Sequence, residues 1–122
     1  MEKNITTPKH LKYFVERCKY WQDLFSLKRY TINFLHADID YSFASFKVSR
    51  AAMYCVVTLC KTWDGRVPTE LELDRTAFHE ISELMLVPLR HKAFLSCNEA
   101  DVEKDTHEVI RTLENTVFEL LR

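Results

Sequence analysis

Glycine is almost absent from this chain of 122 residues, which contains a single one, Gly65. Loops that bind phosphate groups, such as the P-loop and the dinucleotide-binding turn, need several glycines close together, so the sequence excludes both kinds of site. The same scarcity excludes the glycine-flanked turn that presents a nucleophilic serine in many hydrolases. A metal site is therefore the main catalytic device that this sequence can still carry.

Excess positive charge and long apolar runs are also missing. The formal net charge is −1, so the chain lacks the surplus of lysine and arginine with which proteins neutralise nucleic-acid phosphates, and we expect no nucleic-acid partner. No run of about 18 apolar residues occurs, so we expect no membrane span. The first residues contain no apolar stretch typical of a signal peptide, which favours a cytoplasmic location.

The sequence also lacks closely paired cysteines of the kind that bind structural zinc. None of the four cysteines belongs to a C-x-x-C pair, which argues against a structural zinc ribbon. In a cytosolic protein such residues are typically small members of the core.

What the chain does contain is enough apolar residues, 47%, for the core of one domain spanning residues 1–122. Apolar residues recur at helical spacing in two regions and near the end of the chain, whereas alternation or β-branched residues indicate strands between them. We predict three helices: the first over 11–27, the second from the loop 64–69 to Val87, where Pro88 ends or kinks it, and the third from the polar stretch 98–101 to about residue 121. The predicted strands are 30–36, 42–48 and 53–60. This order predicts an α+β fold in which a mainly antiparallel three-stranded sheet packs its helices on one face.

The most informative segment is the apolar, helically periodic stretch 76–87, which contains the sequence His79-Glu80-Ile81-Ser82-Glu83. Residues four apart lie on one helix face, so His79 and Glu83 can bind one metal ion together. Glu80 is turned by about 100° from His79 and can lie beside the metal without binding it. The zinc-protease signature H-E-x-x-H has this arrangement, with the Glu as general base. Here Glu83 takes the place of the second His, and carboxylate oxygen is also a normal zinc ligand.

A catalytic zinc site has three protein ligands, and the last predicted helix offers the third. Glu103, His107 and Glu114 lie on the flank of its apolar stripe, whereas Glu108 points nearly opposite and is expected to be solvated. We predict His107 as the third ligand, because imidazole binds zinc well and restores two His and one carboxylate. Glu103, one turn earlier, has two possible roles: alternative ligand, or a carboxylate that orients His107.

The segments that carry these residues resemble the small zincin-type metallopeptidases encoded by bacteriophages and prophages. The matching stretches are 76–86 and 107–115, together with 20–25 before the first predicted strand. The resemblance implies a minimal zincin fold: a small sheet, a motif helix and a ligand-bearing helix. It also implies a Zn²⁺ cofactor, a peptide or protein substrate, and a location in the cytoplasm of a bacterial host. It specifies neither a particular substrate nor an oligomeric state.

Three interpretations of the sequence remain open. The first is a zinc-dependent peptidase in which His79, Glu83 and His107 hold zinc and Glu80 is the catalytic base. The second is a catalytically weak zincin-like protein that binds a phage or host partner, its metal joining two helices. The third is a metal-free interaction module, since a His and a Glu four apart on a helix are often a surface pair worth about 0.2–0.5 kcal/mol.

Overall fold

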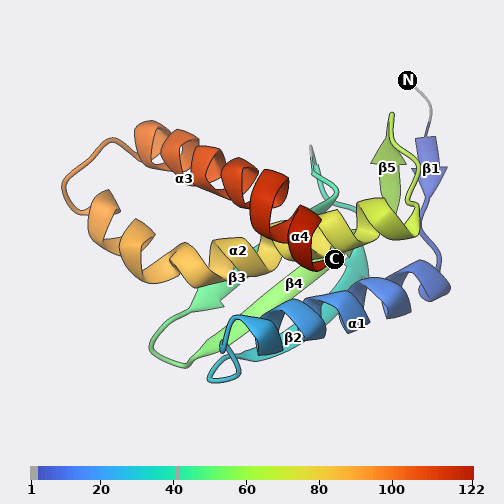
Figure 1. Ribbon diagram of the computed structural model, residues 1–122, viewed down its shortest axis with the longest axis horizontal. Helices are drawn as coiled ribbons and strands as arrows, with labels where there is room; N and C mark the ends of the chain where they lie inside the picture. Colours follow the sequence, from blue (N-terminus) through green and yellow to red (C-terminus); the bar gives the residue numbers. More distant parts are fainter. Residues whose placement is uncertain (1–2, 41) are drawn as a thin grey trace.

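A computed structural model describes residues 3–40 and 42–122, which form three long helices and two small sheets (Figure 1). The predicted mixture of helices and strands is confirmed. The long helices are α1 (Pro8–Leu24), α2 (Glu70–Phe94) and α3 (Glu99–Leu113), and α3 continues through a π-helical turn, η1 (Glu114–Phe118), into the short α4 (Glu119–Leu121). The strands are β1 (Lys3–Ile5), β2 (Thr31–Ala37), β3 (Ala44–Ser49), β4 (Tyr54–Cys60) and β5 (Thr62–Asp64). None of the described helices combines the length and apolar character needed to cross a membrane.

The three predicted strands form one sheet, but their pairing differs from the prediction. The order is β2-β4-β3, with β3 antiparallel to β4 and β2 parallel to it. The expectation of a mainly antiparallel sheet was wrong for the β2–β4 pair, because the chain crosses from one side of β4 to the other between β2 and β3. β4 is the most apolar of the three, and a strand paired on both edges is the natural place for such a run.

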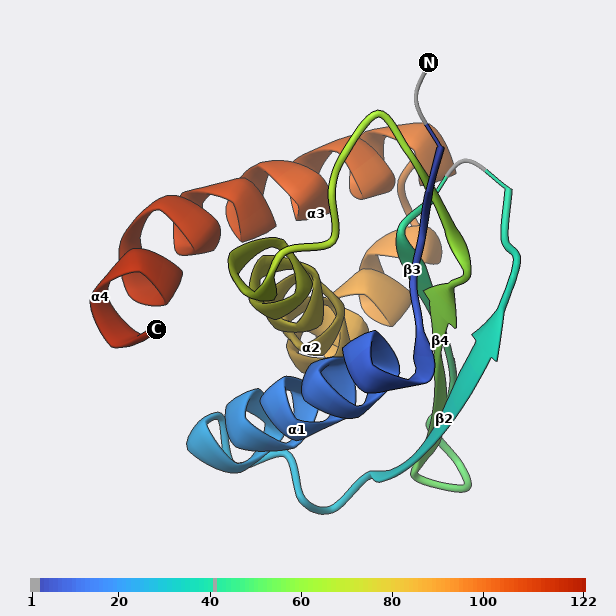
Figure 2. The same cartoon turned by 90° about the vertical axis from the view of Figure 1, so that its right-hand side faces the viewer.

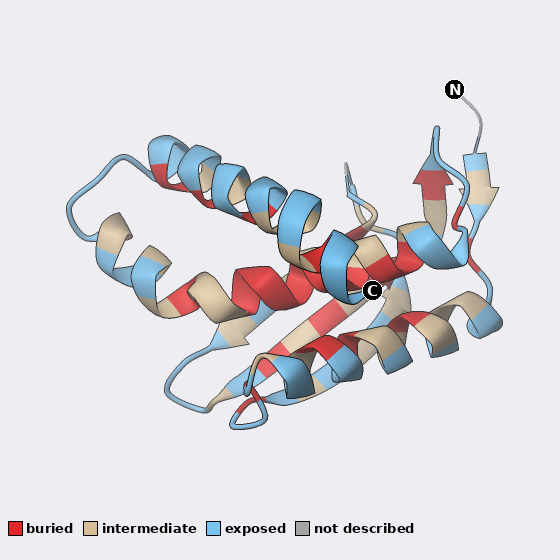
Figure 3. Ribbon diagram, viewed as in Figure 1, coloured by how far each residue is buried: buried red, intermediate tan, exposed pale blue. Residues whose placement is uncertain are grey.

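All three long helices lie on one side of this sheet (Figure 2). Alternate residues of β4 point into the protein: Cys55, Val57 and Leu59 are almost completely buried. α2 lies between α1 and α3, and its middle turns are largely buried (Figure 3). The centre of the core is aromatic, and Phe78 of α2 has its ring centroid 4.9 Å from that of Trp21.

Capping residues determine where α1 and α2 begin. Thr7 precedes Pro8 and accepts a hydrogen bond from the backbone N–H of His10, whose ring Nδ1 accepts from the backbone N–H of Thr7. α1 therefore begins at Pro8 rather than at residue 11 as predicted. The Thr69 hydroxyl caps α2 by accepting a hydrogen bond from the N–H of Glu72.

α2 does not end near Pro88, contrary to the prediction, and continues to Phe94. A proline inside a helix removes one backbone hydrogen bond and costs about 3 kcal/mol. The apolar residues before it offset this cost, since Leu84 and Val87 are each only 1% exposed. As a consequence Arg90 is held on α2 and pairs with Glu103 of α3.

A second, two-stranded sheet, in which β1 pairs antiparallel with β5, was not predicted from the sequence. Each of these strands has three residues, too few to show an alternating pattern.

The π-helical turn in the final helix was also not predicted. The buried residues there recur every four positions at Val102, Thr106 and Ile110, and Phe118 follows eight positions later. In a regular α-helix such a spacing drifts by about 40° per step. The wider turn at η1, with hydrogen bonds from i to i+5, reverses that drift.

Candidate metal centre

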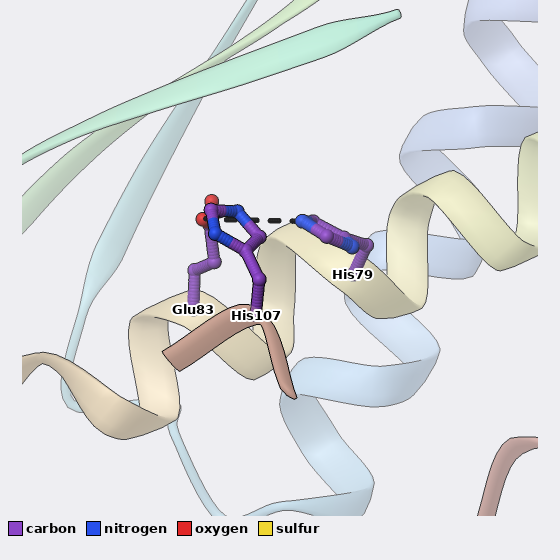
Figure 4. A group of neighbouring side chains, drawn as sticks. All are labelled: His79, Glu83 and His107. Carbon is purple, nitrogen blue, oxygen red and sulfur yellow. Dashed lines mark ion pairs between the residues drawn. The ribbon is translucent and has the colours of Figure 1, made fainter. Parts of the chain in front are cut away.

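The three residues predicted as metal ligands lie together where α3 crosses α2. His79 and Glu83 project from adjacent turns of α2, and His107 reaches them from α3 (Figure 4). One ligand atom from each of the three lies within 4.8 Å of the other two. The two imidazole rings are stacked, with centroids 5.4 Å apart. The predicted convergence of these side chains is confirmed.

The spacing of the ligand atoms suits a small cation. With bonds of about 2.1 Å and tetrahedral angles, the ligands of zinc lie about 3.4 Å from one another. Nε2 of His107 lies 3.3 Å from Oε1 of Glu83, and Nε2 of His79 lies 3.9 Å from the same oxygen. The His79 side chain is 31% exposed and the His107 side chain is 40% exposed, so the cluster is open to solvent on one side. The residues present therefore fit zinc with one position left for a further ligand.

Both imidazoles are held so that Nε2 faces Glu83. Nδ1 of His79 lies 2.8 Å from Oε1 of Glu114, and Nδ1 of His107 lies 2.8 Å from the backbone oxygen of Glu103. Both partners are acceptors, so Nδ1 carries the proton and the lone pair is placed on Nε2. Metal-bound histidines nearly always have such a partner on their other nitrogen.

Glu103 takes neither role predicted for its carboxylate. Its side chain pairs with Arg90 and does not reach the His107 ring; the backbone oxygen of Glu103 orients that ring instead. The prediction for the carboxylate failed because the helix was expected to end or kink at Pro88, whereas α2 continues to Phe94. With α2 continuing past Pro88, Arg90 lies opposite Glu103 and binds it.

Charge around His79 favours a cation. Burial disfavours the charged imidazolium, but the hydrogen bond that His79 donates to Glu114 and the negative charges of Glu83 and Glu114 outweigh it and raise the pKa of His79. The same carboxylates stabilise any positive charge placed at the cluster, whether a proton or a metal ion.

Glu80 lies beside the cluster and is 4% exposed. Burial, the negative charge of Glu83 and a hydrogen bond with Glu83 raise the pKa of Glu80 well above its usual range, and Arg90 opposes them. Its Oε2 atom is buried without a hydrogen-bond partner among the described residues. Two adjacent carboxyl groups, one with an unpaired oxygen, need a proton or a cation between them, which agrees with a metal at Glu83.

A cleft between α2 and β3 gives access to the cluster. It consists of two adjoining cavities of about 280 and 290 Å³. His79 and Glu80 line both cavities, and Ser42 and Ala44 line them from the opposite side. The second cavity also reaches Glu83 and His107, so the candidate ligands and Glu80 lie at the middle of the cleft.

Comparisons with family models, with curated proteins and with solved structures found no match for this chain. The resemblance to phage zincin-type peptidases thus stays an expectation from the motif residues, and the candidate site rests on its own geometry.

Glu114 was not predicted to contribute to the site, although its predicted position is on the same helix flank as His107. A carboxylate seven positions after His107 is the signal that was available. It indicated the correct face, but the partner of Glu114 depends on the packing of α3 against α2. Glu108, in contrast, is exposed as predicted.

Proposed function

We propose that this protein is a zinc-dependent peptidase in which His79, Glu83 and His107 hold the metal and Glu80 is the general base. One observation carries the proposal: two imidazole Nε2 atoms and one carboxylate oxygen converge, with both Nδ1 atoms occupied by acceptors. A surface ion pair does not require that arrangement, whereas a metal ligand set does.

The roles of the residues follow from their positions. When bound, zinc polarises a carbonyl group and lowers the pKa of a water molecule. Glu80 follows His79 directly and contacts Glu83, so its carboxylate lies next to the ligand set without belonging to it. A carboxylate there can accept the proton of an attacking water and pass it to the departing amine. Burial supports this role, because it raises the pKa of the Glu80 carboxyl group and so makes its carboxylate a stronger base than that of a solvated glutamate.

The cleft favours an extended peptide as substrate. β3 has a neighbour on one edge only among the described strands, and residues 42–46 at and before its start line the cleft opposite His79 and Glu80. An unpaired strand edge can bind an extended chain through backbone hydrogen bonds. A peptide bound along this edge would pass over the candidate metal ligands.

The test combines metal analysis with two substitutions and one control variant. We expect protein purified without chelator to contain one zinc ion per chain, and His107→Ala to lose it. Glu80→Gln keeps the size of the side chain and removes the base, so it should retain zinc while peptide hydrolysis falls by at least about 10²-fold. Glu108→Gln, an exposed position on α3, is the matched control. Full hydrolysis by the Glu80→Gln variant would refute the proposed role of Glu80.

In a second candidate function the metal has a structural role only. This candidate is favoured because the ligands come from two different helices. His79 and Glu83 belong to α2 and His107 to α3, so one ion would join the two helices. Zinc present at 100 times its dissociation constant stabilises the folded state by about 2.7 kcal/mol. Both candidates predict that a chelator lowers the melting temperature. Hydrolysis by the zinc-loaded wild type that is lost in Glu80→Gln supports only the peptidase.

A further inference from the structure

The two ends of the cleft differ in the positive charges that line them. At the end away from His107, the cavity of about 280 Å³ is lined by two arginines, Arg66 and Arg75. At the opposite end the arginine is Arg90, which is bound by the carboxylate of Glu103 within the same cavity. The positive charge of that end is therefore compensated inside the cavity.

The two arginines at the first end are only loosely held. Arg66 contacts a carboxylate oxygen of Glu72 at 3.3 Å, and Arg75 contacts one of Glu119 at 3.2 Å. Neither glutamate lines the cavity. Such partly exposed single contacts are worth about 0–1 kcal/mol, so a better placed carboxylate can replace them.

Both guanidinium groups also lie near aromatic rings that restrict their positions. The Cζ atom of Arg66 is 5.2 Å from the centre of the Phe43 ring, and that of Arg75 is 5.4 Å from the centre of the Phe118 ring. Each guanidinium has five N–H donors, and the contacts above use one of them on each side chain. Nε of Arg75 has no hydrogen-bond partner in the described part of the chain.

The acidic residues that line this cavity are already engaged. Glu114 binds Nδ1 of His79, and Glu80 is hydrogen-bonded to Glu83. Among the described lining residues, no further carboxylate is available to neutralise the two arginines from within the cavity. An anionic group that enters here meets two guanidinium groups, the side chains best suited to bind a carboxylate through paired N–H donors.

We infer that the cavity beside Arg66 and Arg75 binds a carboxylate of the substrate, next to the bond that is cleaved. This inference rests on the proposed peptidase function and names its substrate class: peptides with an acidic group on one defined side of the scissile bond. The group is either an aspartate or glutamate side chain or the C-terminal carboxylate of a short peptide, since both present the same two oxygens.

The experiment measures kcat/KM of the zinc-loaded protein on peptides that carry Glu, Gln or Lys at each position around the cleaved bond. We expect Glu to exceed Gln by about tenfold at one position only, and Lys to be the poorest residue there. Arg66→Gln and Arg75→Gln should each reduce this ratio, and the double variant should reduce it to below about twofold. Arg50→Gln, at an exposed turn, is the matched control and should leave the ratio unchanged. Arg66 is half-exposed, so its variant provides a test even if Arg75→Gln fails to fold.

Peptide amides separate the two sources of the carboxylate. If amidation of the C-terminus removes the preference, the chain end is bound; if the preference survives amidation, the side chain is bound. An equal rate for Glu and Gln peptides at every position, or a preference that survives in the double arginine variant, overturns the inference.

Binding to the zinc-loaded Glu80→Gln variant distinguishes this inference from the proposed function. Fluorescence anisotropy of labelled Glu and Gln peptides measures affinity without cleavage. Charge-selective binding that depends on Arg66 and Arg75, without hydrolysis by the wild type, would support the carboxylate site and contradict the peptidase. Hydrolysis with no charge preference would support the peptidase and contradict the carboxylate site.

Discussion

Oε1 of Glu114 lies 2.8 Å from Nδ1 of His79, although the two residues are 35 positions apart and belong to different helical segments. The contact fixes the orientation of the His79 ring and directs its Nε2 toward Glu83. A candidate metal ligand on α2 is therefore held in place by the segment that follows α3.

Substitution of Glu114 should weaken metal binding in a graded way. Loss of a partner of this kind typically lowers metal affinity about 10–100-fold. Glu114→Ala removes the acceptor and should have the full effect. Glu114→Gln keeps an acceptor oxygen but not the charge, and should fall between Ala and the wild type. Competition for zinc with a chromophoric chelator measures the affinities. Glu108→Ala is the control, and an equal loss of affinity in that variant would contradict the role assigned to Glu114.

Replacing Asp74 should destabilise the protein more than replacing a surface aspartate. Oδ1 of Asp74 accepts hydrogen bonds from Nε of Arg17 at 2.9 Å and from Nε1 of Trp21 at 2.7 Å, which join α1 to α2. Asp74→Ala leaves the buried Trp21 N–H unpaired and should lower the free energy of unfolding by about 3 kcal/mol. Urea unfolding measures this change.

The control for Asp74 is Asp23→Ala. Asp23 pairs with Lys28 on the surface, with both side chains mostly exposed. Its substitution should change the free energy of unfolding by less than about 1 kcal/mol. Similar losses in the two variants would show that the Asp74 network does not stabilise the packing of α1 on α2.

The cysteines should differ in reactivity, because three are buried and Cys97 is exposed. Burial raises the pKa of the Cys55 thiol to about 12 and raises that of Cys18 well above its usual range. An alkylating reagent at pH 8 should therefore modify Cys97 alone in the folded protein and all four thiols after denaturation, as counted by mass spectrometry. Rapid modification of a second thiol in the folded state would contradict the burial of the other three.

The same shifts predict how stability depends on pH. In the unfolded chain the thiols ionise near their ordinary pKa of about 8.5, whereas in the folded protein Cys55 and Cys18 stay protonated to higher pH. Their contribution to stability is complete below that value and is lost as the pH rises toward 12. We expect the free energy of unfolding to fall between pH 9 and pH 11, and Cys55→Ala to reduce this fall.

Features that depend on local periodicity were predictable from the sequence. His79 and Glu83 share a face because the residues around them repeat at helical spacing, and His107 lies on the flank of an apolar stripe that has to face α2. The larger strands also appeared within one or two residues of their predicted positions, because alternation is a local property of the chain.

Features that depend on packing between distant segments were not predictable in this way. The parallel pairing of β2 with β4 is set by which strand takes the centre of the sheet. The pairing of Arg90 with Glu103 requires α2 to continue through Pro88, where burial outweighs the local effect of a proline. The partner of Glu114 depends on the same kind of information, since nothing near residue 114 in the sequence specifies His79.

The π-helical turn is equivalent to one residue inserted into an otherwise regular helix. If residues 114–118 took the α pattern with none of them lost, the chain beyond would rotate by about 100° relative to α3. Phe118, which is fully buried, would then leave the core while His107 kept its place on α2. A strictly regular helix could satisfy the candidate metal centre or the aromatic core, but not both. The irregular turn thus lets one continuous segment contribute to the candidate metal centre near its start and to the aromatic core at its end.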